Sequence, residues 1–395
     1  MFKKIRKLDY WIAVPFAILS ALGVVMVFSA SLTNSAMLNF YKQLLFVFIG
    51  WIGAFTLFHF NINNWRNEKW IKVMMFGIIG LLIIARIMPA VNGAHGWIPL
   101  GIITLQPAEF LKLVLILYFA DFFAKHPWQP HVKLPQQPIS QLNAWFLPFS
   151  SLFLLFIMPD NGNMIIAAII MLTIVLAAGV SKKITVAWFA IAGIGFGLLQ
   201  PIINLIDKVF HLTGSTHYGI LRLINFVNPW ADPDQSRQLL YGYYAIAHGG
   251  MFGVGLGNSL IKPYLPESNT DFIMAVMTEE LGAVVTVIVL ILLLIIITRL
   301  IILGIRQKRQ YQRLVMYGVA TLLFIQAFVN LSGVIGVLPI TGVVFPFISG
   351  GGSSYIAFCA FSRSFNASTM AFGTNFTILS APILPISLTM ELEIF

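Results

Sequence analysis

The sequence predicts an all-α, polytopic integral membrane protein with about ten transmembrane helices, and three observations indicate this class. Of its 395 residues 58% are hydrophobic and only 10% are charged, whereas soluble domains have about 25% charged residues. Ten apolar runs are long enough to approach or exceed the span of a bilayer. Lys and Arg alternate in abundance between successive loops, as the positive-inside rule requires. The net charge of +10 therefore indicates loop asymmetry and anionic lipid, and no nucleic acid partner is expected.

The apolar runs follow one another along most of the chain, and residues 1–365 are expected to form one transmembrane domain. The first run follows a cluster of basic residues, as in a signal peptide, but its length of about 20 residues predicts a spanning helix. The runs cover 11–31, 41–59, 71–88, 104–124, 144–158, 163–180, 184–205, 272–303, 313–335 and 346–365.

The basic residues predict the orientation of these spans. With a cytoplasmic N-terminus, most of the 24 Lys and Arg residues fall in inner loops and tails. This topology places the long loop 206–271 outside the cytoplasmic membrane. Because the loop is rich in Trp and Tyr, we expect an ordered segment lying on the membrane, with short interfacial helices.

Asp271 stands where this long polar loop meets the eighth apolar run. An ionisable group at such a boundary is a functional candidate by default. Alternatively, Thr270 or Asp271 caps the following helix, a role worth about 1 kcal/mol. The local sequence alone does not separate these two interpretations.

Other charged residues lie inside the apolar runs. Glu109 and Lys112 are one helical turn apart and on one face. They form either a self-neutralising pair that holds helices together or a site of which one member faces a polar cavity, and we favour the cavity. Glu279 and Glu280 lie deeper along the eighth run and on other faces than Asp271, so we expect structural roles for both.

Several features of the outer side suit an anionic ligand. Arg222 offers paired donors to a phosphate, or anchors the chain at lipid headgroups. The glycine-rich turn Ser349–Ser354 lies at the start of the tenth run, where backbone N–H groups at a helix N-terminus would face an anion. The histidines are scattered, so no metal site is expected from them, and Cys359 is the single cysteine, which excludes an internal disulfide. A carboxylate base and nearby cations together suit a phosphorylated, lipid-linked substrate.

Ordered motifs run through most of the chain. They are Phe28-Ser29-Ala30-Ser31, Gln43, Asn92-Gly93-Ala94-x-x-Trp97-Ile98, Gln106-Pro107-Ala108-Glu109-Phe110-x-Lys112, Pro159-Asp160-x-Gly162, Arg222-x-x-x-Phe226-x-Asn228-Pro229, Gly249-Gly250-x-x-Gly253-x-Gly255-Leu256-Gly257, Leu265-Pro266-Glu267-x-x-Thr270-Asp271-Phe272-Ile273 and Pro346-Phe347-Ile348-Ser349-x-Gly351-Gly352-Ser353-Ser354. With these motifs the chain resembles the SEDS family, the RodA/FtsW/SpoVE membrane glycosyltransferases of bacterial cell-wall synthesis.

The resemblance implies polymerisation of lipid II into glycan strands at the outer face of the cytoplasmic membrane. Asp271 would deprotonate the acceptor hydroxyl, undecaprenyl pyrophosphate would leave, and the anomeric configuration would invert. The implied partners are a class B penicillin-binding protein and other division or elongation proteins. The resemblance does not decide whether the reaction uses a divalent cation such as Mg²⁺ or Mn²⁺. The substrate-binding residues implied are Lys112, Glu109, Arg222, Asp160, Ser353 and Ser354.

The resemblance is closer to the division branch, FtsW/SpoVE, through the run from Gly255 to Ser259. Three features depart from the family pattern. Gly96 stands where a larger polar residue is common, Asn269 replaces the usual histidine before Thr270-Asp271, and the tail 366–395 is apolar where a basic tail is usual. We assign the tail no function.

Two rival functions remain from other classes. A transporter that flips lipid II would also carry polar residues inside its spans, and a scaffold would only recruit the transpeptidase. For the enzyme, we expect Lys112 to lie within salt-bridge reach of Asp271, or to face it across one cavity on the outer side.

Overall fold

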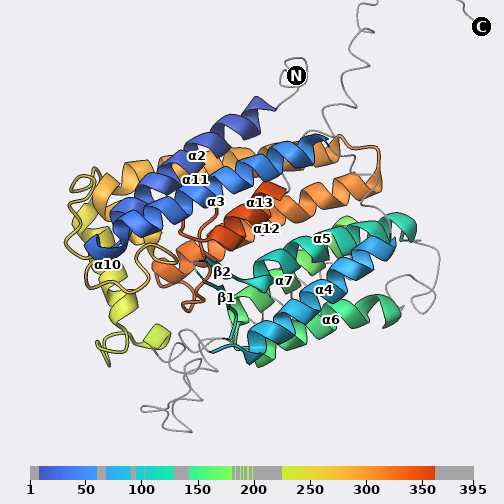
Figure 1. The fold of residues 1–395 in the computed structure, drawn as a ribbon, viewed down its shortest axis with the longest axis horizontal. Coiled ribbons are helices and arrows are strands. Elements are labelled where there is room, and N and C mark those ends of the chain that lie inside the picture. Colours follow the sequence, from blue (N-terminus) through green and yellow to red (C-terminus); the bar gives the residue numbers. More distant parts are fainter. Residues whose placement is uncertain are drawn as a thin grey trace, which may run out of the picture.

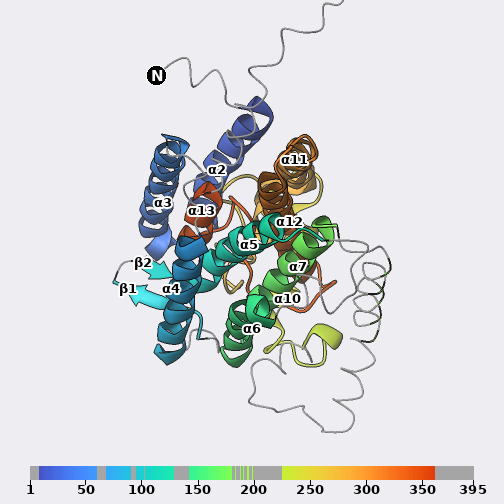
Figure 2. The same cartoon turned by 90° about the vertical axis from the view of Figure 1, so that its right-hand side faces the viewer.

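The computed structural model describes residues 9–59, 68–89, 95–101, 103–128, 142–179 and 225–360, together with five single positions between 183 and 198. These residues form a bundle of helices that run roughly side by side (Figures 1 and 2). The helices are α2 (Tyr10–Ala30), α3 (Thr33–His59), α4 (Glu68–Ile87), α5 (Pro107–Lys125), α6 (Leu142–Ile157), α7 (Asn161–Ala177), α10 (Arg237–Gly249), α11 (Ile273–Ile305), α12 (Gln310–Val334) and α13 (Gly352–Ala360).

The helices confirm the predicted all-α membrane fold. Nine of the ten predicted spans coincide with described helices, and the span 184–205 lies outside the described residues apart from single positions. Five helices, α2, α3, α4, α11 and α12, contain stretches long and apolar enough to cross a membrane, while α6 and α7 are apolar but shorter. Helix α5 carries four charged side chains in its 19 residues, which lowers its hydropathy although its surface is largely buried.

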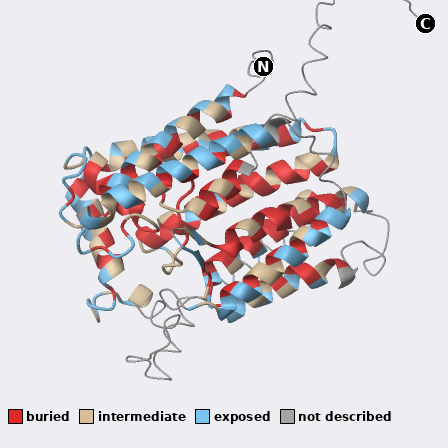
Figure 3. Cartoon of the chain, in the orientation of Figure 1, coloured by how far each residue is buried: buried red, intermediate tan, exposed pale blue. Residues whose placement is uncertain are grey.

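Helix α12 lies at the centre of the bundle. It packs against α5, α7 and α11, and α11 in turn packs against α2 and α10. Gly318 of α12 allows this close approach, since a Cβ there would meet Ile116 of α5 and Ile174 of α7. Burial is therefore highest along α5 and α12, while α2, α3 and α6 expose large apolar side chains on their outer faces (Figure 3). Such outward apolar faces suit contact with lipid.

The structure differs from the predicted elements at two helix starts. The short hairpin of β1 (Ile98–Leu100) and β2 (Ile103–Leu105) occupies the expected beginning of the fourth span. Helix α5 begins only after it, at Pro107, because proline lacks an N–H and fits the first helical position. Residues 346–351 form turns, so α13 starts at Gly352. A short helix in the loop 206–271 was predicted, and α10 confirms it; residues 206–224 lie outside the described part of the chain.

Helix α11 is interrupted at Gly282, where φ is 84° and ψ is 167°. At this break, the second glycine-rich segment of the chain, residues 250–257 after α10, packs directly against the backbone of α11. Ala283 N donates to the carbonyl of Gly250 at 3.0 Å, and Val254 N donates to the carbonyl of Glu279 at 2.9 Å. Only glycine readily adopts this backbone conformation.

We expect Gly282→Ala to lower the stability of the folded protein substantially. A Cβ at residue 282 would overlap the carbonyl oxygen of Met251 and lie 2.6 Å from the nitrogen of Gly253, on a backbone that disfavours side chains. The strained backbone alone costs on the order of 1–3 kcal/mol. Gly77→Ala is the matched control, because a Cβ on this α4 glycine would meet no atom within 4 Å. Thermal unfolding of the detergent-purified variants measures the difference, and equal melting temperatures would contradict the prediction.

Candidate active site

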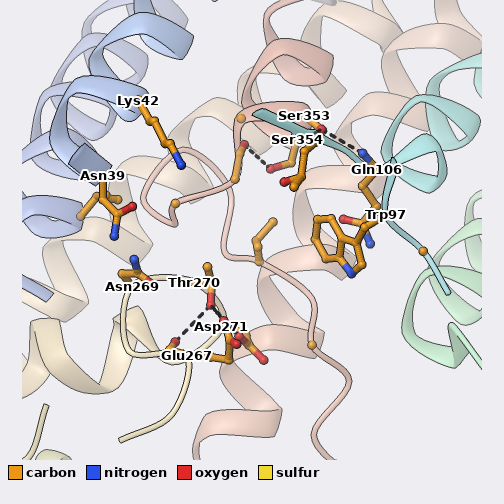
Figure 4. Close-up of a pocket in the computed structure, with 18 of the residues that line it drawn as sticks. Asn39, Lys42, Trp97, Gln106, Glu267, Asn269, Thr270, Asp271, Ser353 and Ser354 are labelled. Atoms are coloured by element: carbon orange, nitrogen blue, oxygen red, sulfur yellow. Dashed lines mark hydrogen bonds between the residues drawn. The ribbon is translucent and has the colours of Figure 1, made fainter. Parts of the chain in front are cut away.

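A cavity of about 480 Å³ opens between the hairpin, α3, α13 and the loop that precedes α11. Asn39 and Lys42 line it from α3, and Trp97 lines it beside the hairpin (Figure 4). Residues of the loops 266–271, 341–344 and 350–354 and of the turn at Asp160 line it as well, together with Val27 of α2 and Gln238 of α10. Segments distant in the sequence therefore meet at one polar space.

Asp271 lines this cavity and is 8% exposed. Its Oδ1 accepts a hydrogen bond from the hydroxyl of Thr270 at 2.9 Å. Its backbone carbonyl accepts from Asn330 Nδ2 of α12 at 2.7 Å. The N-cap residue of α11 is Phe272, which makes no side-chain cap hydrogen bond, and Thr270 and Asp271 precede it. The position of Asp271 at the cavity agrees with a chemical role.

The loop that carries Asp271 is held at both sides. Ser268 Oγ donates to the carbonyl of Ala30 in α2 at 2.9 Å. Gly350 N donates to the carbonyl of Asn269 at 2.8 Å. The Asn269 side chain, which departs from the family pattern, donates to Ser31 Oγ at 3.1 Å and lines the cavity. These bonds fix the carboxylate relative to α2 and the glycine-rich turn.

Asp160 lies in the turn between α6 and α7 and also lines the cavity. Its two carboxylate oxygens accept from Asn163 Nδ2 at 3.0 Å each, and it caps the N-terminus of α7. Burial raises the pKa of Asp160, and the hydrogen bonds from Asn163 oppose that rise. Gly96, which also departs from the family pattern, lies beside Asp160, since a Cβ at residue 96 would be 3.4 Å from an Asp160 oxygen.

Glu109 and Lys112 lie behind the cavity wall, and neither is among its lining residues in the part of the chain that the structure describes. The Lys112 side chain is fully buried, and its ammonium donates to Glu109 Oε1 at 2.7 Å, Gln326 Oε1 at 2.9 Å and Asn163 Oδ1 at 3.1 Å. The expectation that Lys112 faces Asp271 across one cavity is wrong, because three buried acceptors already surround the amine. Asn163 nevertheless connects Lys112 to Asp160 at the cavity.

Ser353 and Ser354 line the cavity at the N-terminus of α13 (Figure 4). Ser353 Oγ accepts from the backbone N–H of Gln106 at 3.1 Å, which ties the hairpin to α13. Ser354 Oγ donates to the carbonyl of Gly351 at 2.8 Å. Arg222, the remaining predicted site residue, lies outside the described residues.

The sequence analysis did not select several residues that line the cavity. Lys42 brings an ammonium group from α3, and its only sequence signal is a cation directly before Gln43 in an apolar run. Glu267 and Thr270 belong to the motif that contains Asp271, but the hydrogen bond between their side chains could not be predicted from the sequence. Within the described residues, no three His, Cys, Asp or Glu side chains gather to hold a metal ion.

A model of the cell cycle protein family that comprises FtsW, RodA and SpoVE matches residues 10–363. The chain belongs to this family. The predicted family is thereby confirmed.

Named relatives agree with this membership. A probable peptidoglycan glycosyltransferase FtsW of Lactococcus lactis is 36% identical over 384 residues, covering 88% of this chain and 89% of that protein. The FtsW relative of Bacillus subtilis is 32% identical, with 90% and 88% covered, and its stage V sporulation protein E is 30% identical, with 88% and 92% covered. These names confirm the predicted closer resemblance to the division branch, FtsW/SpoVE.

Two solved structures share the fold. A chain from a peptidoglycan synthase complex that coordinates polymerization and crosslinking superposes with a TM-score of 0.72 at 24% identity, covering 93% of this chain and 99% of that one. The rod shape determining protein RodA of Thermus thermophilus superposes with a TM-score of 0.64 at 24% identity, covering 91% and 96%. These structures support the fold class.

We expect Lys112→Met to destabilise the protein strongly, because it leaves the buried Glu109 carboxylate without its cation. Breaking a buried ion pair from one side costs on the order of 3–5 kcal/mol. Adding Glu109→Gln should recover much of the loss, since the remaining buried group is then neutral. Thermal unfolding of the single and double variants in detergent measures both steps.

The control is Lys72→Met, which breaks an exposed pair of the same 2.7 Å length between Lys72 and Glu68. Exposed pairs contribute about 0–1 kcal/mol, so this change should be nearly silent. Equal losses at residues 72 and 112 would contradict the assignment of a buried, mutually dependent pair.

Proposed function

We propose that this chain polymerises lipid II into glycan strands, with Asp271 as the general base. The predicted enzyme class, a peptidoglycan glycosyltransferase, is confirmed by the names of its relatives. The observation that carries the assignment of the base is the position of Asp271, whose carboxylate lines a cavity of about 480 Å³ that also contains an ammonium group. A candidate base must reach the hydroxyl it deprotonates, and this geometry gives it that access.

The reaction follows from the groups around the cavity. Asp271 accepts the proton of the acceptor sugar hydroxyl while that oxygen attacks the anomeric carbon of the donor. The bond to the pyrophosphate oxygen breaks, undecaprenyl pyrophosphate leaves, and the configuration inverts. Lys42 and the N-terminus of α13 at Gly352 and Ser353 offer positive charge and backbone N–H groups to the departing pyrophosphate. No step is assigned to a metal ion such as Mg²⁺ or Mn²⁺.

The other predicted site residues have direct or indirect roles in this proposal. Asp160, Ser353 and Ser354 contact the substrate directly, because all three line the cavity. Glu109 and Lys112 act through Asn163, which joins them to Asp160. We keep Arg222 as a phosphate ligand on the strength of the sequence motif alone.

The proposed topology follows the positive-inside rule. The apolar helices and family membership support a multi-pass membrane protein. We place the N-terminus in the cytoplasm and the cavity on the outer face of the bacterial cytoplasmic membrane. We propose one transmembrane domain over residues 1–365 and give the tail 366–395 no role. A class B penicillin-binding protein is the proposed partner, which the resemblance to a chain from a peptidoglycan synthase complex supports.

Purified protein with lipid II tests the function directly. The wild type should produce a glycan ladder on a gel, and Asp271→Asn should reduce polymerisation by at least about 100-fold, since general bases contribute about 10²–10⁴-fold. Asp234→Asn is the matched control, because its carboxylate is 93% exposed and outside the cavity.

Parallel vesicle assays separate the rival functions. Movement of labelled lipid II across vesicles without glycosidic bonds would indicate a flippase instead. A wild-type ladder that Asp271→Asn leaves intact would overturn the assignment of the base. Each assay is run with and without the cognate transpeptidase and with and without a divalent cation.

A further inference from the structure

The hydroxyl of Thr270 lies between two carboxylates at the cavity. Thr270 Oγ1 is 2.6 Å from Glu267 Oε2 and 2.9 Å from Asp271 Oδ1 (Figure 4). Asp271 is buried at the cavity, whereas Glu267 is exposed. One hydroxyl therefore connects a carboxylate inside the site to one in contact with solvent.

A hydroxyl has one hydrogen and two acceptor lone pairs. Thr270 donates to only one of the two carboxylates at a time. If the other carboxylate is protonated, Thr270 accepts its hydrogen bond while donating onward. The observed distances suit both bonds, because O–H···O contacts to carboxylates are commonly 2.5–3.0 Å. The three side chains thus have the geometry of a two-step proton path.

The backbone holds this arrangement in place. Glu267 has a φ of 54°, in the left-handed region that non-glycine residues seldom adopt. Its carbonyl accepts from Thr270 N at 3.2 Å and Phe272 N at 3.1 Å. Asn330 of α12 holds the carbonyl of Asp271. A tight turn keeps the three side chains together, and glycine would form the turn with less strain. A carboxylate at this position therefore calls for a reason other than backbone shape.

We propose that Glu267, acting through Thr270, receives the proton that Asp271 removes from the acceptor hydroxyl. Protonated Asp271 gives its hydrogen to Thr270 Oγ1 while Thr270 gives its own hydrogen to Glu267 Oε2. Asp271 returns to the carboxylate, Thr270 is unchanged, and Glu267 releases the proton to water. The step moves one proton and creates no net charge. This inference rests on the proposed glycosyltransferase function.

The charged groups that face this path come from several elements. Lys42 of α3 and Asp160 of the α6–α7 turn line the same cavity, and Glu109 with Lys112 lies behind Asp160. Glu267 differs from these groups because it is exposed and shares a hydroxyl with Asp271, so its side chain connects the buried carboxylate to water.

The test is the rate of polymerisation by Glu267→Gln as a function of lipid II concentration. We expect the plateau rate at saturating lipid II to fall about tenfold or more, because the proton has lost its acceptor, while KM for lipid II changes little. Thr270→Val should lower the plateau rate, because the methyl groups transfer no proton, and Thr270→Ser should restore it. Glu267→Gly distinguishes a role in the backbone turn from a role in proton transfer, because glycine adopts the positive φ of residue 267 without strain. If Glu267 only shapes the turn, this variant should be fully active. If Glu267 receives the proton, the variant should lose activity as Glu267→Gln does. Asp234→Asn again serves as the exposed control.

The outcomes distinguish this proposal from the function on which it rests. If Asp271→Asn is inactive while Glu267→Gln and Thr270→Val keep the wild-type rate, only the proton path is wrong. If the wild type makes no glycan, the function fails, and infrared difference spectra of the carboxyl band still test the path. Glu267→Gln should shift the carboxylate band of Asp271, because it changes the second acceptor of the hydroxyl that both carboxylates share. An unchanged band would overturn the proposal.

Discussion

Two amide side chains of α12 determine how the site is assembled. Gln326 accepts from the Lys112 ammonium at 2.9 Å and donates to the carbonyl of Val344 at 3.2 Å. Asn330, one turn later on the same face, donates to the carbonyls of Asp271 and Val343 at 2.7 Å each. Both amides are buried. The central helix therefore holds the loop with Asp271, the 343–344 wall of the cavity and the buried lysine in one rigid unit.

This arrangement also explains how a lysine is tolerated in the middle of a membrane protein. An ammonium group has three hydrogens, and Lys112 places them on a carboxylate and two amide oxygens. One of these acceptors carries a full negative charge, so the cluster around Lys112 and Glu109 is neutral. Because the partners come from α5, α7 and α12, the same bonds fasten three helices together. In an apolar medium such satisfied polar contacts also specify which helix faces meet.

Hydropathy and charge predicted the helices well, because a bilayer imposes the same length and apolar surface on every span. The family motifs implied Asp271, Asp160, Ser353 and Ser354 as site residues, and in the structure all four line one cavity. The sequence wrongly placed Lys112 near Asp271, since the spacing of residues along one helix does not show which neighbouring helix offers an acceptor.

The sequence did predict structural roles for Glu279 and Glu280. Glu279 accepts from the backbone of Leu260 at 3.0 Å, and Glu280 accepts from Ser29, as those roles require. The hairpin escaped prediction because a three-residue strand has too few positions to show a period.

The buried polar residues bear on the choice between an enzyme and a transporter. Polar groups along a translocation path must stay available to the moving headgroup, whereas those of a fixed site are held by one another. Among the described residues, Asp160, Asn163, Lys112, Glu109 and Gln326 form one continuous chain of hydrogen bonds. Asp160 lines the cavity and the other four lie behind it. Opening the chain would leave a buried ammonium and a buried carboxylate without partners. These polar groups are therefore held by one another, which favours a fixed site beside Asp271 over a path that a headgroup moves along.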